Sequence, residues 1–118
     1  MSLKQGLAAE EKARHFLIKK GFQWIESNYR CRWGEIDLIM RDKNYLVFIE
    51  VRARTSSAYG GAAASITYSK RQKLIKSAEH YLLTKKWQGN CPVRFDVVSM
   101  DGANSEMEWI NNAFGMDF

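Results

Sequence analysis

The spacing of hydrophobic residues switches along the chain between the period of a helix and that of a strand, and the switches predict the order of the elements. Ser2 and Gly21 are typical of the two ends of a first helix. Runs rich in β-branched and aromatic residues predict strands. The expected elements are a helix over residues 2–20, strands over 22–30, 35–41 and 45–54, a helix over 69–86 and a strand over 93–100, with 108–111 as an additional edge strand.

The connections between these elements predict a mixed sheet. Short turns join the first three strands, which favours antiparallel neighbours, whereas the helix at 69–86 is long enough to cross over to a strand parallel with the third. We therefore expect an α/β protein in the order helix, three strands, helix, strand, with a mixed central sheet flanked by helices. One domain over residues 1–118 accommodates all of these elements.

The turn after the second strand sets the register of the second and third strands. A two-residue loop at 43–44 is typical of a β-hairpin. Because side chains alternate between the two faces, a slip of one residue would move every side chain to the opposite face. The register pairs Asp42 with Tyr45, Asp37 with Glu50 and Glu35 with Arg52.

Both predicted helices carry charged residues that need an explanation. Glu10 falls in the middle of the apolar stripe of the first helix, where a carboxylate is costly unless something pairs with it. Arg14, one turn later, is one partner, and a functional role for Glu10 is the alternative. Lys70, Lys73 and Lys76 form a row on the second helix, which suits either a phosphate backbone or a solvated face. The first stripe consists of Leu3, Leu7, Leu17 and Ile18, and the second of Leu74, Ala78, Tyr81 and Leu82.

The composition is that of a soluble globular domain without disulfides or zinc. Of 118 residues, 46% are hydrophobic and 26% are charged. No apolar run approaches the ~20 residues of a transmembrane helix, and no signal segment opens the chain. Cys31 and Cys91 have no metal-binding spacing, and His15 and His80 give a nucleophile–histidine pair few candidates. We expect a cytoplasmic protein with no membrane contact.

Positive charge is concentrated in the first part of the chain. The net charge is +5, although residues 101–118 contain only acidic charges. The basic surplus therefore lies in residues 1–100. Such a surplus favours nucleic acid as a partner through phosphate contacts and counterion release, and it also serves solubility.

Two carboxylates interrupt the hydrophobic strands at positions that the predicted register makes neighbours. Asp37 and Glu50 would have their Cβ atoms about 5 Å apart on one face, where like charges repel. A divalent cation bound by both would relieve this repulsion. Glu10 could bind the same cation or one of its waters, and Arg52 returns to the same face. The alternative is a self-neutralising surface ladder of Glu35, Asp37, Glu50, Arg52 and Arg54.

Four motifs stand out along the chain: Gly6-x-x-x-Glu10, Gly34-Glu35-Ile36-Asp37-Leu38-Ile39, Val47-Phe48-Ile49-Glu50-Val51-Arg52-x-Arg54 and Arg94-Phe95-Asp96-Val97-Val98. They resemble motifs of the YraN family, and the resemblance covers about residues 6–98. The acidic tail at 101–118 lies outside it.

This resemblance implies the restriction-endonuclease-like fold of the PD-(D/E)xK nucleases and a similarity to archaeal Holliday junction resolvases. By position, Asp37 and Glu50 match the two metal-binding acids, and Glu10 matches the helix-one glutamate of the resolvase-like members. Arg52 stands in the place of the lysine of the motif. Because a guanidinium stays protonated, Arg52 cannot act as a base, but it can orient the nucleophile or stabilise charge on phosphorus.

The sequence thus predicts a metal-dependent DNA endonuclease, with Glu10, Asp37 and Glu50 around Mg²⁺ or Mn²⁺ and branched DNA as the substrate. A nucleic-acid-binding module that has lost turnover is the alternative, and a protein adaptor with a basic face is a third hypothesis. A homodimer, as in the resolvases, is left open. Contacts to nucleic acid are expected from Arg30, Arg32, Arg54, Lys70 and Lys73, and Trp33 is a candidate platform for an unpaired base.

Overall fold

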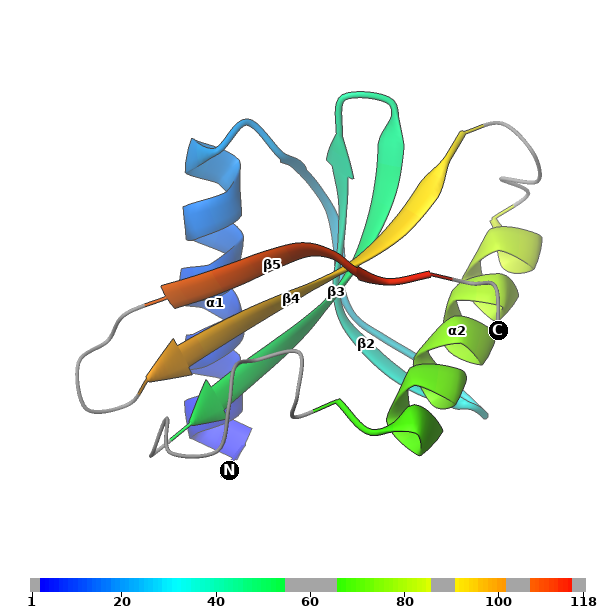
Figure 1. Cartoon of the computed structure of the whole chain (residues 1–118), viewed down its shortest axis with the longest axis horizontal. Coiled ribbons are helices and arrows are strands. Elements are labelled where there is room, and N and C mark those ends of the chain that lie inside the picture. The colour runs from blue at the N-terminus through cyan, green and yellow to red at the C-terminus, as the bar shows by residue number, and fades with distance from the viewer. Residues whose placement is uncertain (1–2, 55–65, 86–90, 102–106, 116–118) are drawn as a thin grey trace.

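A five-stranded sheet with two helices makes up the part of the chain that this computed structural model describes, residues 3–54, 66–85, 91–101 and 107–115 (Figure 1). The elements are α1 (Leu3–Lys19), β1 (Gln23–Cys31), β2 (Gly34–Asp42), β3 (Tyr45–Arg54), α2 (Tyr68–Thr84), β4 (Val93–Asp101) and β5 (Met107–Phe114). The predicted order is confirmed, and β5 is longer than the tail strand expected from the sequence. Ser2 and the side chains of Leu3 and Leu7, which were predicted to cap and line α1, lie outside the described part.

The sheet has the strand order β1-β2-β3-β4-β5, with β3 at its centre. β3 and β4 are parallel, and all other neighbours are antiparallel. The predicted crossover through α2 is therefore confirmed. A strand covered on both faces is expected to be continuously hydrophobic, and residues 46–49 of β3 are all buried.

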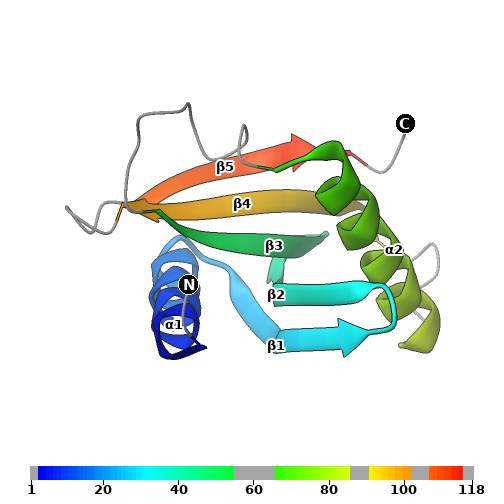
Figure 2. The same ribbon diagram turned by 90° about the horizontal axis from the view of Figure 1, so that it is seen from below.

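The two helices pack on opposite faces of the sheet (Figure 2). α1 buries Ala9, Ala13 and Leu17, whose spacing of four residues places them on one narrow stripe. The two alanines are small, so the helix can lie close to β2 and β3. Ile18, which was predicted on the same stripe, is 44% exposed, and that prediction was wrong.

α2 begins with an N-cap at Thr67, whose hydroxyl accepts a hydrogen bond from the Lys70 backbone N–H at 3.2 Å. Its predicted stripe is confirmed for Leu74, Ala78 and Tyr81, which are buried against the other sheet face. Within the described residues, neither helix has the length and hydropathy of a membrane span.

The hairpin between β2 and β3 has the predicted register. Asp42 pairs with Tyr45, and the ladder continues to Leu38 opposite Ile49. Lys43, in the two-residue loop, has a φ of 56°, as a tight hairpin turn requires. The ladder stops at Leu38, so the predicted pairs that involve Asp37 and Glu35 lie beyond its end.

Asp96 connects β4 to β5 through hydrogen bonds of its side chain. Its buried carboxylate accepts hydrogen bonds from Arg94 Nε at 2.9 Å, from Trp109 Nε1 at 3.0 Å and from the backbone N–H of Asn112 at 2.9 Å. Arg94 also pairs with Asp42 at 2.9 Å. These bonds fix the edge strand β5 in place, away from the acids of β2.

Candidate metal centre

The candidate site opens where β2 and β3 separate. Beyond the pair Leu38 and Ile49, the backbone of Val51 donates its N–H to the side chain of Asp37, with 2.8 Å between nitrogen and Oδ2. The carboxylate of Asp37 therefore replaces the strand carbonyl that would have continued the ladder. This bond orients Asp37 between the strands, and the side chain of Asp37 is also hydrogen-bonded to that of Glu10.

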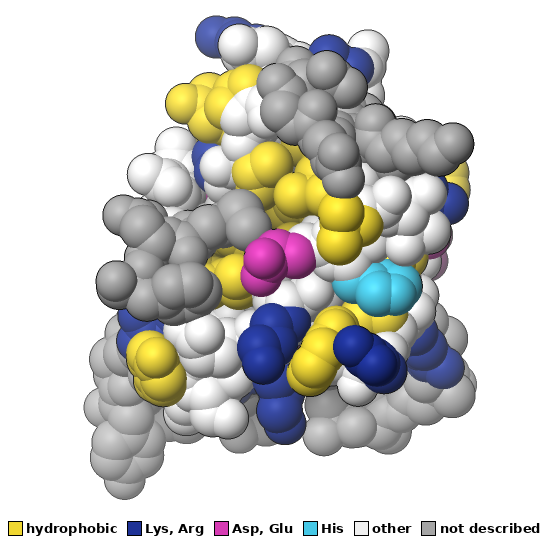
Figure 3. All heavy atoms as spheres, turned by 90° about the vertical axis from the view of Figure 1, so that its right-hand side faces the viewer, with side chains coloured by type: hydrophobic (Ala, Val, Ile, Leu, Met, Phe, Trp, Pro, Cys, Tyr) yellow, Lys and Arg dark blue, Asp and Glu magenta, His cyan; other side chains and the backbone are white. Residues whose placement is uncertain are grey.

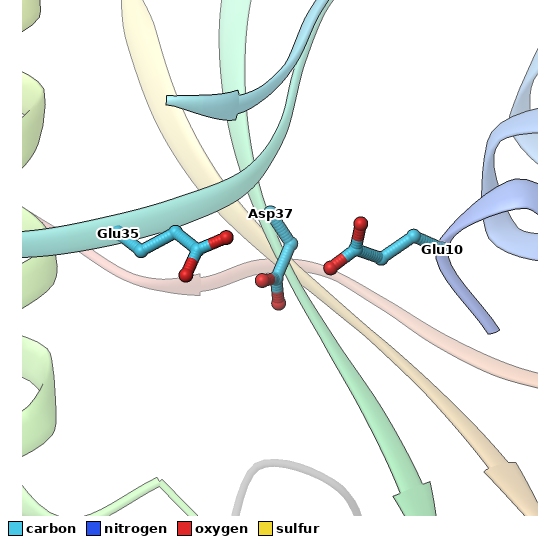
Figure 4. A group of neighbouring side chains, drawn as sticks. All are labelled: Glu10, Glu35 and Asp37. Atoms are coloured by element: carbon cyan, nitrogen blue, oxygen red, sulfur yellow. The ribbon is translucent and has the colours of Figure 1, made fainter. Parts of the chain in front are cut away.

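Three carboxylates converge at this point. One oxygen each from Glu10, Glu35 and Asp37 lies within 4.8 Å of the others. Figure 4 shows Glu10 reaching from α1 and Glu35 from β2, so that the two approach Asp37 from opposite sides. The predicted proximity of Glu10 to Asp37 is thus present, and Glu35 joins them although it was not among the predicted ligands. Its spacing of two residues from Asp37 on one strand was the available signal.

Glu10 is held by Asn28 rather than by the arginine that the sequence offered. A hydrogen bond from the Asn28 side chain lowers the pKa of Glu10, but burial has the larger effect and raises it overall. Asn28 itself has a φ of 56°, a left-handed conformation that asparagine tolerates better than most residues. Arg14 lies instead over the ring of Trp24, 5.0 Å from its centroid. The interpretation of Glu10 as an ion-pair partner of Arg14 was wrong.

Among the acids of the site, Asp37 has the pKa that is shifted furthest from its ordinary value. Burial, followed by the negative charge of Glu50, raises its pKa from the ordinary value of 3.8 to about 8, against the lowering effect of the Val51 N–H. Burial and the charge of Glu50 both favour the protonated form of the metal-free carboxyl. A divalent cation would take the place of that proton, because metal ligands bind in the deprotonated form.

Glu50 belongs to the same site but has cationic neighbours. Its side chain is 7% exposed, and its Oε1 lies 2.8 Å from Lys70 Nζ and 3.7 Å from Arg52 Nη1. The sequence placed Arg52 beside Glu50, and the structure agrees. It did not indicate that Lys70 of α2 would reach this carboxylate.

A cavity of about 390 Å³ connects Glu35, Asp37 and Glu50 on the α2 side of the sheet, whereas Glu10 lines a separate hollow together with Asn28. Gly34 lines the cavity wall with a φ of 149°, a backbone conformation that favours glycine. Glu50 is buried and Asp37 is intermediate in exposure, so these two acids do not lie on an exposed ladder, although Glu50 does pair with Arg52 as that alternative expected. The lining residues are Gly34, Glu35, Asp37, Glu50, Thr67, Ser69, Lys70, Lys73 and Leu74.

The residues of the cavity fit a hard divalent cation. Mg²⁺ and Mn²⁺ prefer carboxylate oxygens, and Mg²⁺ is commonly held by one or two of them together with water. Two ligands on opposite sides of one Mg²⁺ are about 4.2 Å apart, so oxygens within 4.8 Å need only a small adjustment to share an ion. Asp37 and Glu10 or Glu35 would hold the ion, and Glu50 would join after separation from its cationic partners.

The residues predicted to bind nucleic acid have varied surroundings. Arg30 is exposed and lies 3.6 Å from Glu35, while Lys73 lines the cavity. Arg32 lies over the ring of Trp33 at 4.6 Å, and Lys76 lies at 4.5 Å from the same ring, so cations already contact the proposed base platform. The side chain of Arg54 lies outside the described ones.

Basic side chains predominate over acidic ones on the face that α2 forms (Figure 3). The exposed residues of this helix include Arg71, Lys73 and Lys76, with Glu79 as an acidic exception. The cavity that holds the carboxylates is therefore bordered by positive charge.

The element order and the mixed sheet are those of the α/β fold predicted from the sequence. The profile of Uncharacterised protein family UPF0102 matches residues 9–100 of the chain. The chain therefore belongs to UPF0102, the family also known as YraN.

Relatives in this family match nearly the whole chain. A UPF0102 protein of Legionella pneumophila (strain Corby) is 48% identical over 97% of this chain and 97% of its own length. One from Nitrosomonas europaea is 50% identical over 93% of this chain and 92% of its own. One from Saccharophagus degradans is 46% identical over 95% and 93%, respectively.

Proposed function

We propose that this protein is a metal-dependent phosphodiesterase that cleaves DNA, with branched DNA as its substrate. The observation that supports the proposal most directly is the convergence of Glu10, Glu35 and Asp37, from α1 and β2, beside the buried Glu50. Like charges so close together repel one another, and the burial of Glu50 beside them adds a desolvation cost. The basic face of α2 beside the cavity matches a polyanionic substrate.

The side chains of the site would divide the work of hydrolysis. Bound Mg²⁺ or Mn²⁺ supplies an activated water and stabilises charge on the leaving oxygen. Asp37, with Glu10 and Glu50, holds the ion, and the bond from Val51 fixes the direction of Asp37. Arg52, permanently charged and close to Glu50, orients the nucleophile and stabilises charge on the phosphate.

The test is cleavage of a four-way DNA junction, with linear duplex for comparison, in the presence of Mn²⁺ or Mg²⁺. We expect cleavage by the wild type, and a loss of at least 100-fold, on the order seen when a principal electrostatic group is removed, in Asp37→Ala and Glu50→Ala. Glu79→Gln, an exposed acid on α2, serves as the matched control and should keep wild-type activity. Equal activity of all three variants would refute the assignment.

A nucleic-acid-binding module without turnover is the second candidate. The observation that favours it is that Lys70 and Arg52 already neutralise Glu50. This candidate predicts salt-sensitive binding of DNA that persists in Glu50→Ala, with no cleavage under any metal condition. Filter binding at several salt concentrations, run beside the cleavage assay, separates the two functions.

A further inference from the structure

We propose that Lys70 and the metal ion exchange at Glu50: the ammonium neutralises this carboxylate in the metal-free protein, and ion binding releases it as a cation for the scissile phosphate. The inference rests on the proposed function, because it assigns a role within the same site. It gives the cavity a mobile positive charge in addition to the fixed guanidinium of Arg52.

The contact with Glu50 is the first support. Lys70 Nζ lies 2.8 Å from Oε1, which is the length of a charge-assisted hydrogen bond, whereas Arg52 Nη1 is 3.7 Å from the same oxygen. The Glu50 side chain is 7% exposed and that of Lys70 is 42% exposed. The carboxylate is therefore fixed within the fold, while the ammonium approaches it from the solvent side and can move away.

The place of Lys70 on its helix is the second support. The first turn of α2 contains no acidic residue, and Lys70 lies there next to Arg71. Cations at a helix N-terminus oppose the helix dipole and destabilise the helix. The Thr67 cap nevertheless fixes the Lys70 backbone at this point. Helix stability does not explain a lysine here, but the carboxylate in front of it does.

The position of the acids completes the argument. Asp37 lines the same cavity as Glu50 and Lys70, and its polar neighbours Glu10 and Glu35 are acidic. An ion held by Asp37 therefore gains most by recruiting the remaining carboxylate, Glu50, and must displace the ammonium to do so. The flexible stem of lysine allows the released group to stay beside the ion, where a phosphate oxygen would lie.

Two simpler roles make different predictions. If Lys70 only stabilised the fold, its removal would weaken metal binding and cleavage together. If it only attracted DNA, its removal would raise KM and leave metal affinity unchanged. Exchange at Glu50 predicts effects of opposite sign: tighter metal binding, because a competitor has gone, and a lower kcat, because the phosphate has lost a cation.

The experiment is calorimetric titration of Mn²⁺ into metal-free wild type, Lys70→Met, Lys70→Arg and Lys73→Met. Lys73 lines the same cavity from the next turn of α2 and is the matched control. Breaking a charge-assisted bond corresponds to about tenfold in affinity, so we expect Lys70→Met to bind Mn²⁺ about tenfold more tightly, with Lys70→Arg and Lys73→Met near wild type. In a Glu50→Gln background the gain should disappear.

The outcomes separate this inference from the function on which it rests. Unchanged or weaker Mn²⁺ binding in Lys70→Met, with normal binding by the wild type, overturns the exchange and leaves the metal centre intact. No Mn²⁺ binding by the wild type overturns both. Lys70→Gln provides the same comparison if the methionine variant does not fold, and thermal unfolding of each variant identifies that case. Cleavage by Lys70→Met should show a reduced kcat, with rescue by Lys70→Arg.

Discussion

The raised pKa of Asp37 makes the stability of the metal-free protein depend on pH in an unusual direction. Its folded pKa is about 8 and its ordinary value is 3.8, so between these limits the folded chain holds a proton that the unfolded chain releases. The contribution of this group to stability is fully present below about pH 4 and is lost as pH rises through 8. In most proteins with paired carboxylates, the free energy of unfolding instead rises with pH over the acid end of this range.

The size of the effect follows from proton linkage. One additional bound proton corresponds to a slope of about 1.4 kcal/mol per pH unit, and the slope flattens near the folded pKa. Between pH 5.5 and pH 7.5 the free energy of unfolding should therefore fall by about 2–3 kcal/mol through Asp37. Burial is the largest cause of the shift, so solvent screening reduces this amount little.

Urea unfolding in EDTA at pH 5.5, 6.5 and 7.5 measures the prediction, with Asp37→Asn as the comparison. The amide cannot titrate, so the variant should lack most of the decline, and the difference between the two proteins isolates Asp37 from the histidines. Saturating Mn²⁺ at pH 7.5 should restore the stability of the wild type alone. Parallel declines in wild type and Asp37→Asn would show that Asp37 does not carry the proton.

Three further predictions address the metal centre and its support. Mn²⁺ binding at pH 7 should release about one proton from the wild type and none from Asp37→Asn. Calorimetric titrations in two buffers of different ionisation enthalpy measure the number of protons released. Equal release from the two proteins would contradict a protonated Asp37. Glu35→Gln should weaken Mn²⁺ binding by roughly tenfold while Glu79→Gln does not, and equal affinities would remove Glu35 from the centre. Asp96→Ala should lower the free energy of unfolding by about 3–5 kcal/mol, because it breaks a buried ion pair, and should leave Mn²⁺ affinity nearly unchanged in urea and calorimetric measurements; a large loss of affinity would connect β5 to the site.

Local sequence signals were sufficient for the framework of the fold. The loop at 43–44 set the β2–β3 register, and the hydrophobic run of β3 marked the strand that both helices cover. The predicted register also brought Asp37 and Glu50 together, and both line the same cavity. These features depend on neighbours in sequence, which a single chain displays directly.

Local sequence patterns could not predict the contacts between segments that are distant in the chain. The separation of β2 from β3 at Asp37 depends on a side-chain bond to Val51, and nothing in the strand pattern indicates where a ladder ends. Lys70 reaches Glu50 across the fold, from a helix row that equally suits a solvated face. Arg14 was one turn from Glu10, but helical spacing does not reveal that the Trp24 ring competes for it.

The distribution of unfavourable features within the fold supports a functional centre over a structural network. Among the described residues, every buried side-chain nitrogen or oxygen has a hydrogen-bond partner, as is typical of a well-packed native fold. Asp96 illustrates a structural solution, with every contact supplied by a donor.

The acids at the end of β2 are arranged in the opposite way. Like charges converge there, Asn28 takes a left-handed conformation beside them, and Lys70 lies at the positive end of a helix. A purely structural site would gain stability from replacing one of the converging acids, whereas removal of Lys70 would take the nearer cation from the buried Glu50. Since these features occur together around the carboxylates, we expect some substitutions here, Glu35→Gln above all, to stabilise the metal-free protein while weakening its metal affinity.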